Sequence, residues 1–237
     1  MSRKEECCLV SDLSEGMENF EVRVMNGVDD EKPKSFSYLT KVLYPYHVKA
    51  LQESGCDCTN GCSNCKCLFK NGGEIPFTEK GAIIGPKPII YECGPSCKCP
   101  PSCMNRVGQS GSRIQLEVFR TGSGGWGVRS QSYISSGSFV CEYIGQLKQV
   151  KDNYLGEGTL VGKKERGLAL DTKKSGNVAR FICQSDDLPN LFAQRVLYDH
   201  DDLRMPHIMF FATKDIPPLQ ELSYEYDYDD PLAYQLF

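Results

Sequence analysis

The chain has 237 residues, of which 40% are hydrophobic and 24% are charged, and its formal net charge at pH 7 is -4. This length allows one large domain or two small ones with enough apolar residues to bury a core. The acidic balance excludes a protein that grips nucleic acid chiefly by neutralising phosphates, and it favours a basic partner. Because no apolar signal core or membrane-spanning stretch is present, we expect no membrane association.

The N-terminal quarter of the chain is polar. Residues 1–21 are acidic and predict a flexible N-terminus that contains Cys7 and Cys8. Residues 22–55 combine the acidic run 29–31 with a segment that prolines interrupt, and they predict an irregular lead-in to a cysteine-rich stretch.

Residues 56–110 are rich in Cys, Gly and Pro and show neither the helical nor the strand period, so something other than an apolar core must order them. Disulfides are one alternative. The odd total of 13 cysteines, the absent signal peptide and the C-x-C spacing favour metal thiolates instead. The predicted metal ligands are Cys56, Cys58, Cys62, Cys65, Cys67, Cys93, Cys97, Cys99 and Cys103.

The number of these cysteines indicates how many metal ions they hold. If three sulfurs bridge two metals each and six bind one metal, the nine give three zinc ions four ligands apiece. An iron–sulfur cluster needs only four thiolates, so the other cysteines of the nine would have no clear role. No histidine completes an open, catalytic zinc site within this set, so we expect three structural Zn²⁺ ions.

From residue 111 onward, short apolar runs bounded by Gly and Pro predict many short strands, and therefore a mainly β fold. Cys141 lies within one of these runs, where a buried thiol is unremarkable. Residues 145–170 allow a helical turn within a loop rich in Gly and Lys. The runs span residues 114–119, 125–130, 138–145, 191–198, 207–213 and 221–226.

The cysteine arrangement is followed in order by GWGVRS, CEYIG, GNVARF, PNLFAQRVLYDH and IPPLQELSYEYDY. This succession, over roughly residues 22–229, resembles the pre-SET and SET domains of suppressor-of-variegation histone methyltransferases, and the plant subfamily in particular. The resemblance implies a pre-SET three-zinc cluster over 56–110, a SET domain over 111–229 and a C-terminal tail over 230–237. It further implies small curved β-sheets in which GNVARF and ELSYEY cross in a pseudoknot.

The activity that the resemblance implies is transfer of a methyl group from S-adenosylmethionine to a lysine of the histone H3 N-terminal tail, by subfamily lysine 9, in nuclear chromatin. Attack on a methylsulfonium requires a neutral amine and an in-line approach, so positioning matters more than a strong base. By motif match Tyr226 is the catalytic tyrosine and Tyr224 helps to wall the lysine channel. The alternative is that both are ordinary residues on one strand face, since they are two apart.

The cofactor-binding residues come from the same resemblance. Gly125, Trp126 and Gly127 match the turn where the backbone approaches the cofactor; a tight turn beside an interior Trp is the alternative. Asn177 and Arg180 begin the second cofactor segment, and Tyr154 corresponds to a tyrosine between cofactor and lysine. The acidic residues around ELSYEYDYDD have two interpretations. They attract a basic peptide, or they are an ordinary solvated surface.

Several positions depart from the family pattern. Where the family continues with Asn-His-Ser-Cys, this chain has Cys183-Gln184-Ser185-Asp186, and Gln146 replaces the usual Glu. The post-SET cysteines do not follow Tyr226, and the linker from Gly145 to Gly176 is short.

These departures leave three hypotheses. The first is an active methyltransferase, the second is a catalytically silent chromatin adaptor with the same fold, and the third is a zinc-cluster protein without a histone role. NFEVRVMNGVDDEKP resembles the segment that comes after the methyl-DNA-binding domain of longer plant relatives, but we expect no direct DNA-reading domain in this chain. The oligomeric state is not predicted.

Overall fold

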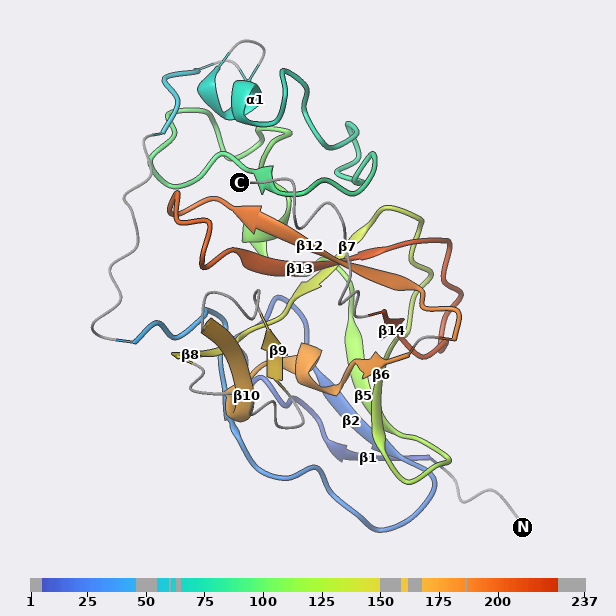
Figure 1. The fold of residues 1–237 in the computed structure, drawn as a ribbon. Helices are drawn as coiled ribbons and strands as arrows, with labels where there is room; N and C mark the ends of the chain where they lie inside the picture. Colours follow the sequence, from blue (N-terminus) through green and yellow to red (C-terminus); the bar gives the residue numbers. More distant parts are fainter. Residues whose placement is uncertain are drawn as a thin grey trace.

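The computed structural model describes residues 6–45, 55–59, 61–62, 65–149, 159–161, 168–185 and 187–225. Within them the chain forms three small β-sheets, with the cysteine-rich segment at one end of the molecule (Figure 1). This confirms the predicted mainly β fold. No helix in these ranges is long and apolar enough to cross a membrane. The predicted residues Tyr154 and Tyr226 lie outside the described ranges.

The first sheet joins the N-terminal segment to the start of the second half of the chain. Its order is β1 (Cys7–Val10), β2 (Arg23–Asn26), β5 (Leu116–Arg120) and β6 (Trp126–Ser130), and β2 lies parallel to β5. Cys7 and Cys8 therefore belong to a strand, whereas a flexible segment was predicted; pairing with β2 gives this polar stretch its regular structure.

The second sheet is small and has β10 (Leu168–Gly176) in the middle. β8 (Gly145–Gln149) and β9 (Thr159–Val161) pair with it antiparallel, and β3 (Ser37–Tyr38) pairs with it in parallel. Within the described part of 145–170, regular structure is strand, so the helical turn predicted there is not seen; residues 150–158 and 162–167 lie outside the described ranges.

The third sheet has the order β11 (Cys183–Gln184), β14 (Ser223–Tyr224), β12 (Leu191–Leu197), β13 (His207–Ala212) and β7 (Phe139–Glu142). β4 (Ile90–Tyr91), from the cysteine-rich segment, pairs with β12 in parallel. The segment also contains the short helix α1 (Lys66–Lys70), although its sequence predicted no regular elements. Two 3-10 turns, η1 (Gly108–Ser110) and η3 (Val178–Phe181), complete the elements.

Strand β13 separates two apolar cores because its side chains alternate between the two faces of the sheet. Phe210 is fully buried in the main core, which it shares with Tyr143 and Tyr224. Its neighbours Met209 and Phe211 are fully buried in a second core on the side of the cysteine-rich segment. The third sheet is thereby fixed from both faces.

Candidate functional site

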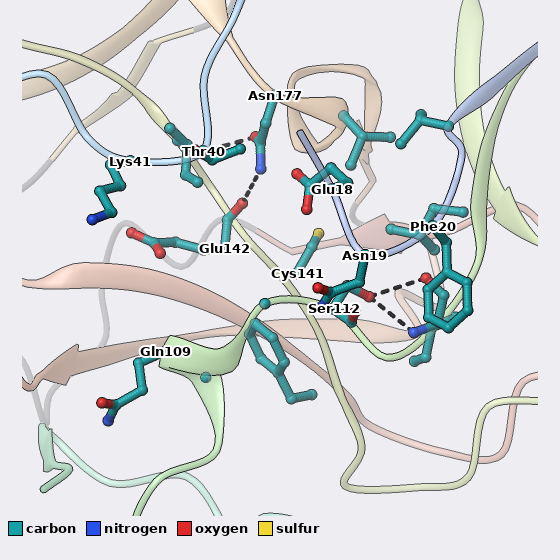
Figure 2. Close-up of a pocket in the computed structure, with 18 of the residues that line it drawn as sticks. Glu18, Asn19, Phe20, Thr40, Lys41, Gln109, Ser112, Cys141, Glu142 and Asn177 are labelled. Atoms are coloured by element: carbon teal, nitrogen blue, oxygen red, sulfur yellow. Dashed lines mark hydrogen bonds between the residues drawn. The ribbon is translucent and has the colours of Figure 1, made fainter. Parts of the chain in front are cut away.

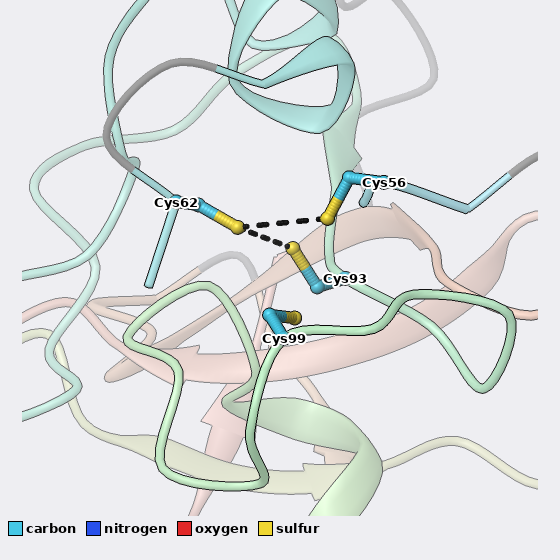
Figure 3. A group of neighbouring side chains, drawn as sticks. All are labelled: Cys56, Cys62, Cys93 and Cys99. Atoms are coloured by element: carbon cyan, nitrogen blue, oxygen red, sulfur yellow. Dashed lines mark hydrogen bonds between the residues drawn. The ribbon is translucent and has the colours of Figure 1, made fainter. Parts of the chain in front are cut away.

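The nine cysteines of residues 56–103 converge into one cluster, in which all but Cys58 are buried, although they come from two separate stretches of chain. Figure 3 shows four of them, Cys56, Cys62, Cys93 and Cys99. The Sγ–Sγ distances are 3.1 Å for Cys62–Cys93, 3.6 Å for Cys67–Cys97 and for Cys103–Cys62, and 3.9 Å for Cys56–Cys62. A disulfide requires about 2.05 Å. Sulfurs bound to one tetrahedral zinc at about 2.3 Å lie roughly 3.8 Å apart, so the observed spacing fits zinc thiolates.

The geometry divides the cluster into three overlapping groups of four sulfurs. They are Cys56, Cys62, Cys93 and Cys99; Cys56, Cys67, Cys93 and Cys97; and Cys56, Cys58, Cys62 and Cys65. Cys62 and Cys93 each belong to two groups and Cys56 belongs to all three, so sulfurs are shared between neighbouring groups. Cys103 belongs to none of the three groups but lies beside Cys62. The cluster is therefore positioned to hold zinc.

Two side chains next to the cluster donate hydrogen bonds to sulfur. Asn105 Nδ2 lies 3.4 Å from Cys93 Sγ, and Arg106 Nη2 lies 3.4 Å from Cys99 Sγ. Nine thiolates around three divalent ions carry excess negative charge, which a guanidinium and an amide donor stabilise. The sequence analysis did not include either residue, although they come two and three positions after Cys103.

The aromatic side chain of Tyr224 lies in the main core on strand β14. Its ring centroid is 4.8 Å from that of Phe210, and the Tyr143 ring meets Phe210 edge-on at 6.2 Å. The Tyr143 hydroxyl is 3.3 Å from Thr172 Oγ1. The structure thus places Tyr224 in an aromatic cluster with Tyr143 and Phe210, two residues that the sequence prediction did not include.

Strand β14 also brings together the two segments that were predicted to cross. Cys183 pairs with Ser223 and Gln184 with Tyr224 in a parallel ladder, and the Ser185 N–H donates to the Tyr224 carbonyl at 2.9 Å. The departure Cys183-Gln184 therefore lies next to Tyr224. Because a ladder uses backbone groups, this pairing does not need the Asn and His side chains of the family pattern.

Gly125, Trp126 and Gly127 lie where the hairpin turn between β5 and β6 enters β6. The Gly125 N–H donates to Thr121 Oγ1 at 2.9 Å, which closes the turn, and the Arg120 guanidinium lies 5.2 Å from the Trp126 ring centre. A Cβ atom on Gly127 would lie 2.7 Å from Glu221 Oε1. A larger residue at 127 would therefore force the Glu221 carboxylate to move and would press against the Phe119 ring.

Asn177 and Arg180 flank the start of η3, and their side chains bind backbone groups. Asn177 Nδ2 donates to the Glu142 carbonyl at 2.8 Å, while its Oδ1 accepts the Ile144 N–H at 3.3 Å. Arg180 Nε donates to the Thr172 carbonyl at 3.1 Å. These bonds fix the backbone on both sides of Tyr143 and at Thr172, whose hydroxyl lies beside the Tyr143 hydroxyl.

A second group of metal-type ligands comprises Asp199, His200 and His207. The Asp202 N–H donates to His200 Nδ1 at 3.1 Å, so a neutral His200 carries its proton on Nε2. That nitrogen faces Asp199 and Tyr44, and while protonated it cannot bind a metal. Asp199, His200 and His207 are therefore arranged as a hydrogen-bond network in which the histidines carry protons.

A cavity of about 100 Å³ lies between the N-terminal segment, η1 and strand β7 (Figure 2). Asn177 is the predicted site residue that lines it, and neither the turn at Gly125–Gly127 nor Tyr224 does so. This cavity is thus separate from the aromatic cluster.

The cysteine-rich segment joins the third sheet through β4, and β14 pairs with β11 in that same sheet beside the aromatic cluster. This arrangement defines the class of pre-SET and SET-domain proteins. Comparison agrees: residues 14–106 match the pre-SET motif and residues 125–227 match the SET domain. The chain belongs to this family, whose members include protein-lysine methyltransferases.

Individual relatives include histone-lysine methyltransferases of the plant Arabidopsis thaliana. The chain is 50% identical, over 228 residues and 92% of its length, to "Histone-lysine N-methyltransferase, H3 lysine-9 specific SUVH5" of Arabidopsis thaliana. Its structure matches Arabidopsis SUVH6 in complex with SAM with a TM-score of 0.87 and 45% identity, over 94% of this chain and 52% of that one. It matches KRYPTONITE in complex with mCHH DNA, H3(1-15) peptide and SAH with a TM-score of 0.86 and 37% identity, over 93% and 48% of the two chains.

The chain spans 28% of the SUVH5 sequence and about half of each of these two solved structures. What is shared is therefore the pre-SET and SET portion of longer proteins.

Proposed function

We propose that this chain is an S-adenosylmethionine-dependent histone-lysine N-methyltransferase that acts in nuclear chromatin on the H3 N-terminal tail, with lysine 9 as its target. The observation that carries the proposal is the position of Tyr224, which lies in the aromatic cluster with Phe210 while its backbone pairs with Gln184. The SUVH5 name specifies H3 lysine 9, and the KRYPTONITE complex contains an H3(1-15) peptide.

Each predicted residue has a role in this proposal. S-adenosylmethionine, when bound, supplies the methyl group. The catalytic role is assigned to Tyr226, whose hydroxyl would act on the neutral lysine amine, and Tyr224 forms the channel wall with Tyr143 and Phe210. Tyr154 is assigned a role at the cofactor and the lysine.

The remaining cofactor residues act through the backbone. Gly125, Trp126 and Gly127 present the main chain of the β5–β6 turn to the cofactor. Asn177 and Arg180 hold the neighbouring segment through their bonds to backbone carbonyls, so their contribution is to position it.

The zinc ions have a structural role in the same proposal. The nine cysteines hold three Zn²⁺ ions, with Asn105 and Arg106 as donors to their sulfurs. These ions order a segment whose apolar content is too low to fold it, and they support β4 where it pairs with β12.

The departure at Cys183-Gln184 is the observation that favours the alternative, a catalytically silent adaptor. A lost side-chain bond to a charged ligand weakens binding by about 1.5–3 kcal/mol. The comparisons do not favour this alternative, because SUVH5 and SUVH6 are both named histone-lysine N-methyltransferases with H3 lysine-9 specificity.

Calorimetric titration of the zinc-loaded chain with S-adenosylmethionine, followed by methyl transfer to an H3-tail peptide in the same sample, tests the proposal. We expect saturable binding, and transfer that Tyr226→Phe abolishes without changing cofactor affinity. Tyr133→Phe is the matched control, since Tyr133 is 54% exposed, and it should leave transfer unchanged. If the chain does not bind S-adenosylmethionine at millimolar concentration, the catalytically silent adaptor becomes the better hypothesis.

A further inference from the structure

The cavity of about 100 Å³ has no role in the methyl-transfer site. Its walls come from the segment around Glu18–Phe20, the loop at Thr40–Lys41, the turn η1 and the end of strand β7 (Figure 2). One water molecule takes up about 30 Å³ of liquid, so this space admits a short organic chain as well as a few waters. The question is which chemical group its walls recognise.

The amide donors in the cavity wall are already used by the protein. Asn19 Nδ2 donates to the carbonyls of Ser110 and Ser112, at 3.2 and 3.0 Å. Gln109 Nε2 donates to Glu92 Oε2 and to the Cys93 carbonyl, and Asn177 Nδ2 donates to the Glu142 carbonyl. These bonds occupy amide N–H groups of the wall, whose other polar groups include the carboxylates of Glu18 and Glu142 as well as the Lys41 ammonium.

The acceptors with spare capacity are the carboxylates of Glu18 and Glu142. Glu18 Oε1 accepts one hydrogen bond, from the Tyr38 hydroxyl at 3.1 Å, and Glu142 Oε1 accepts one from His207 Nδ1 at 2.7 Å. A carboxylate offers about four acceptor sites, so both retain unused ones. Both residues line the cavity, and in Figure 2 the Glu142 carboxylate points towards Lys41.

The charge balance of the wall is negative. His207 also bonds to Asp199, so one imidazolium serves two carboxylates, and within the described ranges no salt bridge reaches Glu18. Burial raises the pKa of Glu18; the Tyr38 hydrogen bond opposes this, and the charges of Asp12 and Glu142 add to it. Lys41 is the cationic side chain among the lining residues, and it is exposed.

The apolar part of the wall contains the rings of Phe20, Phe139 and Tyr198. Phe20 is 46% exposed, whereas Phe139 is buried. Aromatic rings beside carboxylates suit a cation that carries hydrocarbon, because the rings accept the alkyl part and the oxygens accept the N–H groups. The acceptor atoms, the negative charge and the aromatic rings all indicate a cation that carries a hydrocarbon chain.

We propose that this cavity binds a primary alkylammonium group, presented either by a free amine or by a lysine side chain of a basic peptide. The ammonium donates to Glu18 and Glu142 while its alkyl chain lies against the rings. The site does not depend on the proposed methyl transfer, since neither Tyr224 nor the β5–β6 turn lines the cavity.

The test uses the zinc-loaded full chain without cofactor and butylammonium chloride as the probe, followed by NMR at constant ionic strength. We expect saturable binding of butylammonium, and no binding of 1-butanol, which has similar size and no charge. Glu18→Gln should weaken binding at least about 5-fold, because it removes the anionic acceptor. Glu21→Gln makes the same charge change at a carboxylate that does not line the cavity, pairs with Arg23 and is 60% exposed, and should change binding less than about 2-fold.

A second variant keeps the proposal falsifiable if Glu18→Gln fails to fold. Lys41→Met removes an exposed cation from the wall and should tighten butylammonium binding about 2-fold. A short acetylated peptide with one lysine, compared with butylammonium, distinguishes the two sources, and binding of either one supports the site. Equal binding of butanol, or binding that neither Glu18→Gln nor Lys41→Met alters, would overturn it.

Discussion

Glu142 on β7 and His207 on β13 are joined by a 2.7 Å contact between Oε1 and Nδ1, and the other nitrogen of His207 lies 2.9 Å from Asp199 Oδ1. Both ring nitrogens therefore donate, which only the imidazolium form allows. Burial by itself would lower the pKa of His207, but the hydrogen bonds to Asp199 and Glu142 outweigh it and raise the pKa to about 9. This charged histidine ties two strands to the loop after β12.

The raised pKa of His207 predicts a specific pH dependence. Because the folded value lies above the ordinary 6.5, the stabilisation is complete below pH 6.5 and is lost as the pH rises through about 9. We expect the free energy of unfolding in urea to fall by on the order of 3 kcal/mol across that window. His207→Gln should remove this slope. His200→Gln should retain it, since burial lowers the pKa of His200 and places any effect at lower pH.

Removal of zinc should unfold the cysteine-rich segment, because metal binding supplies much of its folding free energy. We expect three zinc ions per chain by colorimetric assay after denaturation, and a loss of far-UV signal on chelation. Cys56→Ser should lower the zinc content most, since Cys56 belongs to all three groups of sulfurs. Cys183→Ser is the control, as Cys183 is exposed and belongs to no group, and structure that survives complete zinc removal would contradict the cluster.

Gly127→Ala should destabilise the chain, since the new Cβ would lie 2.7 Å from Glu221 Oε1 and 3.0 Å from the Phe119 ring. Overpacking of this kind lowers stability by about 1–3 kcal/mol, measurable by urea unfolding. Gly122→Ala, with nothing within 4 Å of its new Cβ, should be close to neutral. Equal stability of the two variants would show that β6 and Glu221 are not packed as described.

Asn177→Ala should be destabilising because it leaves the Glu142 carbonyl and the Ile144 N–H without their side-chain partner. Each buried group left unsatisfied lowers stability by about 1–3 kcal/mol. Thermal unfolding would measure the change, and Asn19→Ala, at an exposed residue, should have a smaller effect. If Asn177 instead acted only on the cofactor, affinity would fall while the unfolding temperature stayed constant.

The zinc cluster was the part of the site that the sequence predicted best. Its cysteines are close in sequence, and spacing alone selected nine residues that the structure gathers into one cluster, eight of them in groups that could hold a metal ion. The donors Asn105 and Arg106 were missed because a hydrogen bond to sulfur leaves no mark on spacing or periodicity.

Six later strands were also predictable, since apolar runs between glycines and prolines mark them, whereas β8, β9, β10 and β11 were not predicted. The six are β5, β6, β7, β12, β13 and β14. The aromatic cluster was not, because Tyr143 and Phe210 meet Tyr224 only through sheet pairings between distant segments. The short elements α1, β1 and β4 were missed for a related reason. Each is ordered by neighbours rather than by its own periodicity.

Strand β4 has two residues, yet it is the point where the zinc-bearing segment enters the third sheet. Ile90, fully buried in the second core, packs there with Val196 and Phe211. The pairing of β4 with β12 therefore connects the cysteine-rich segment to the sheet that carries Tyr224. We expect loss of metal from the cysteines to loosen that sheet, although no metal binds at Tyr224 itself.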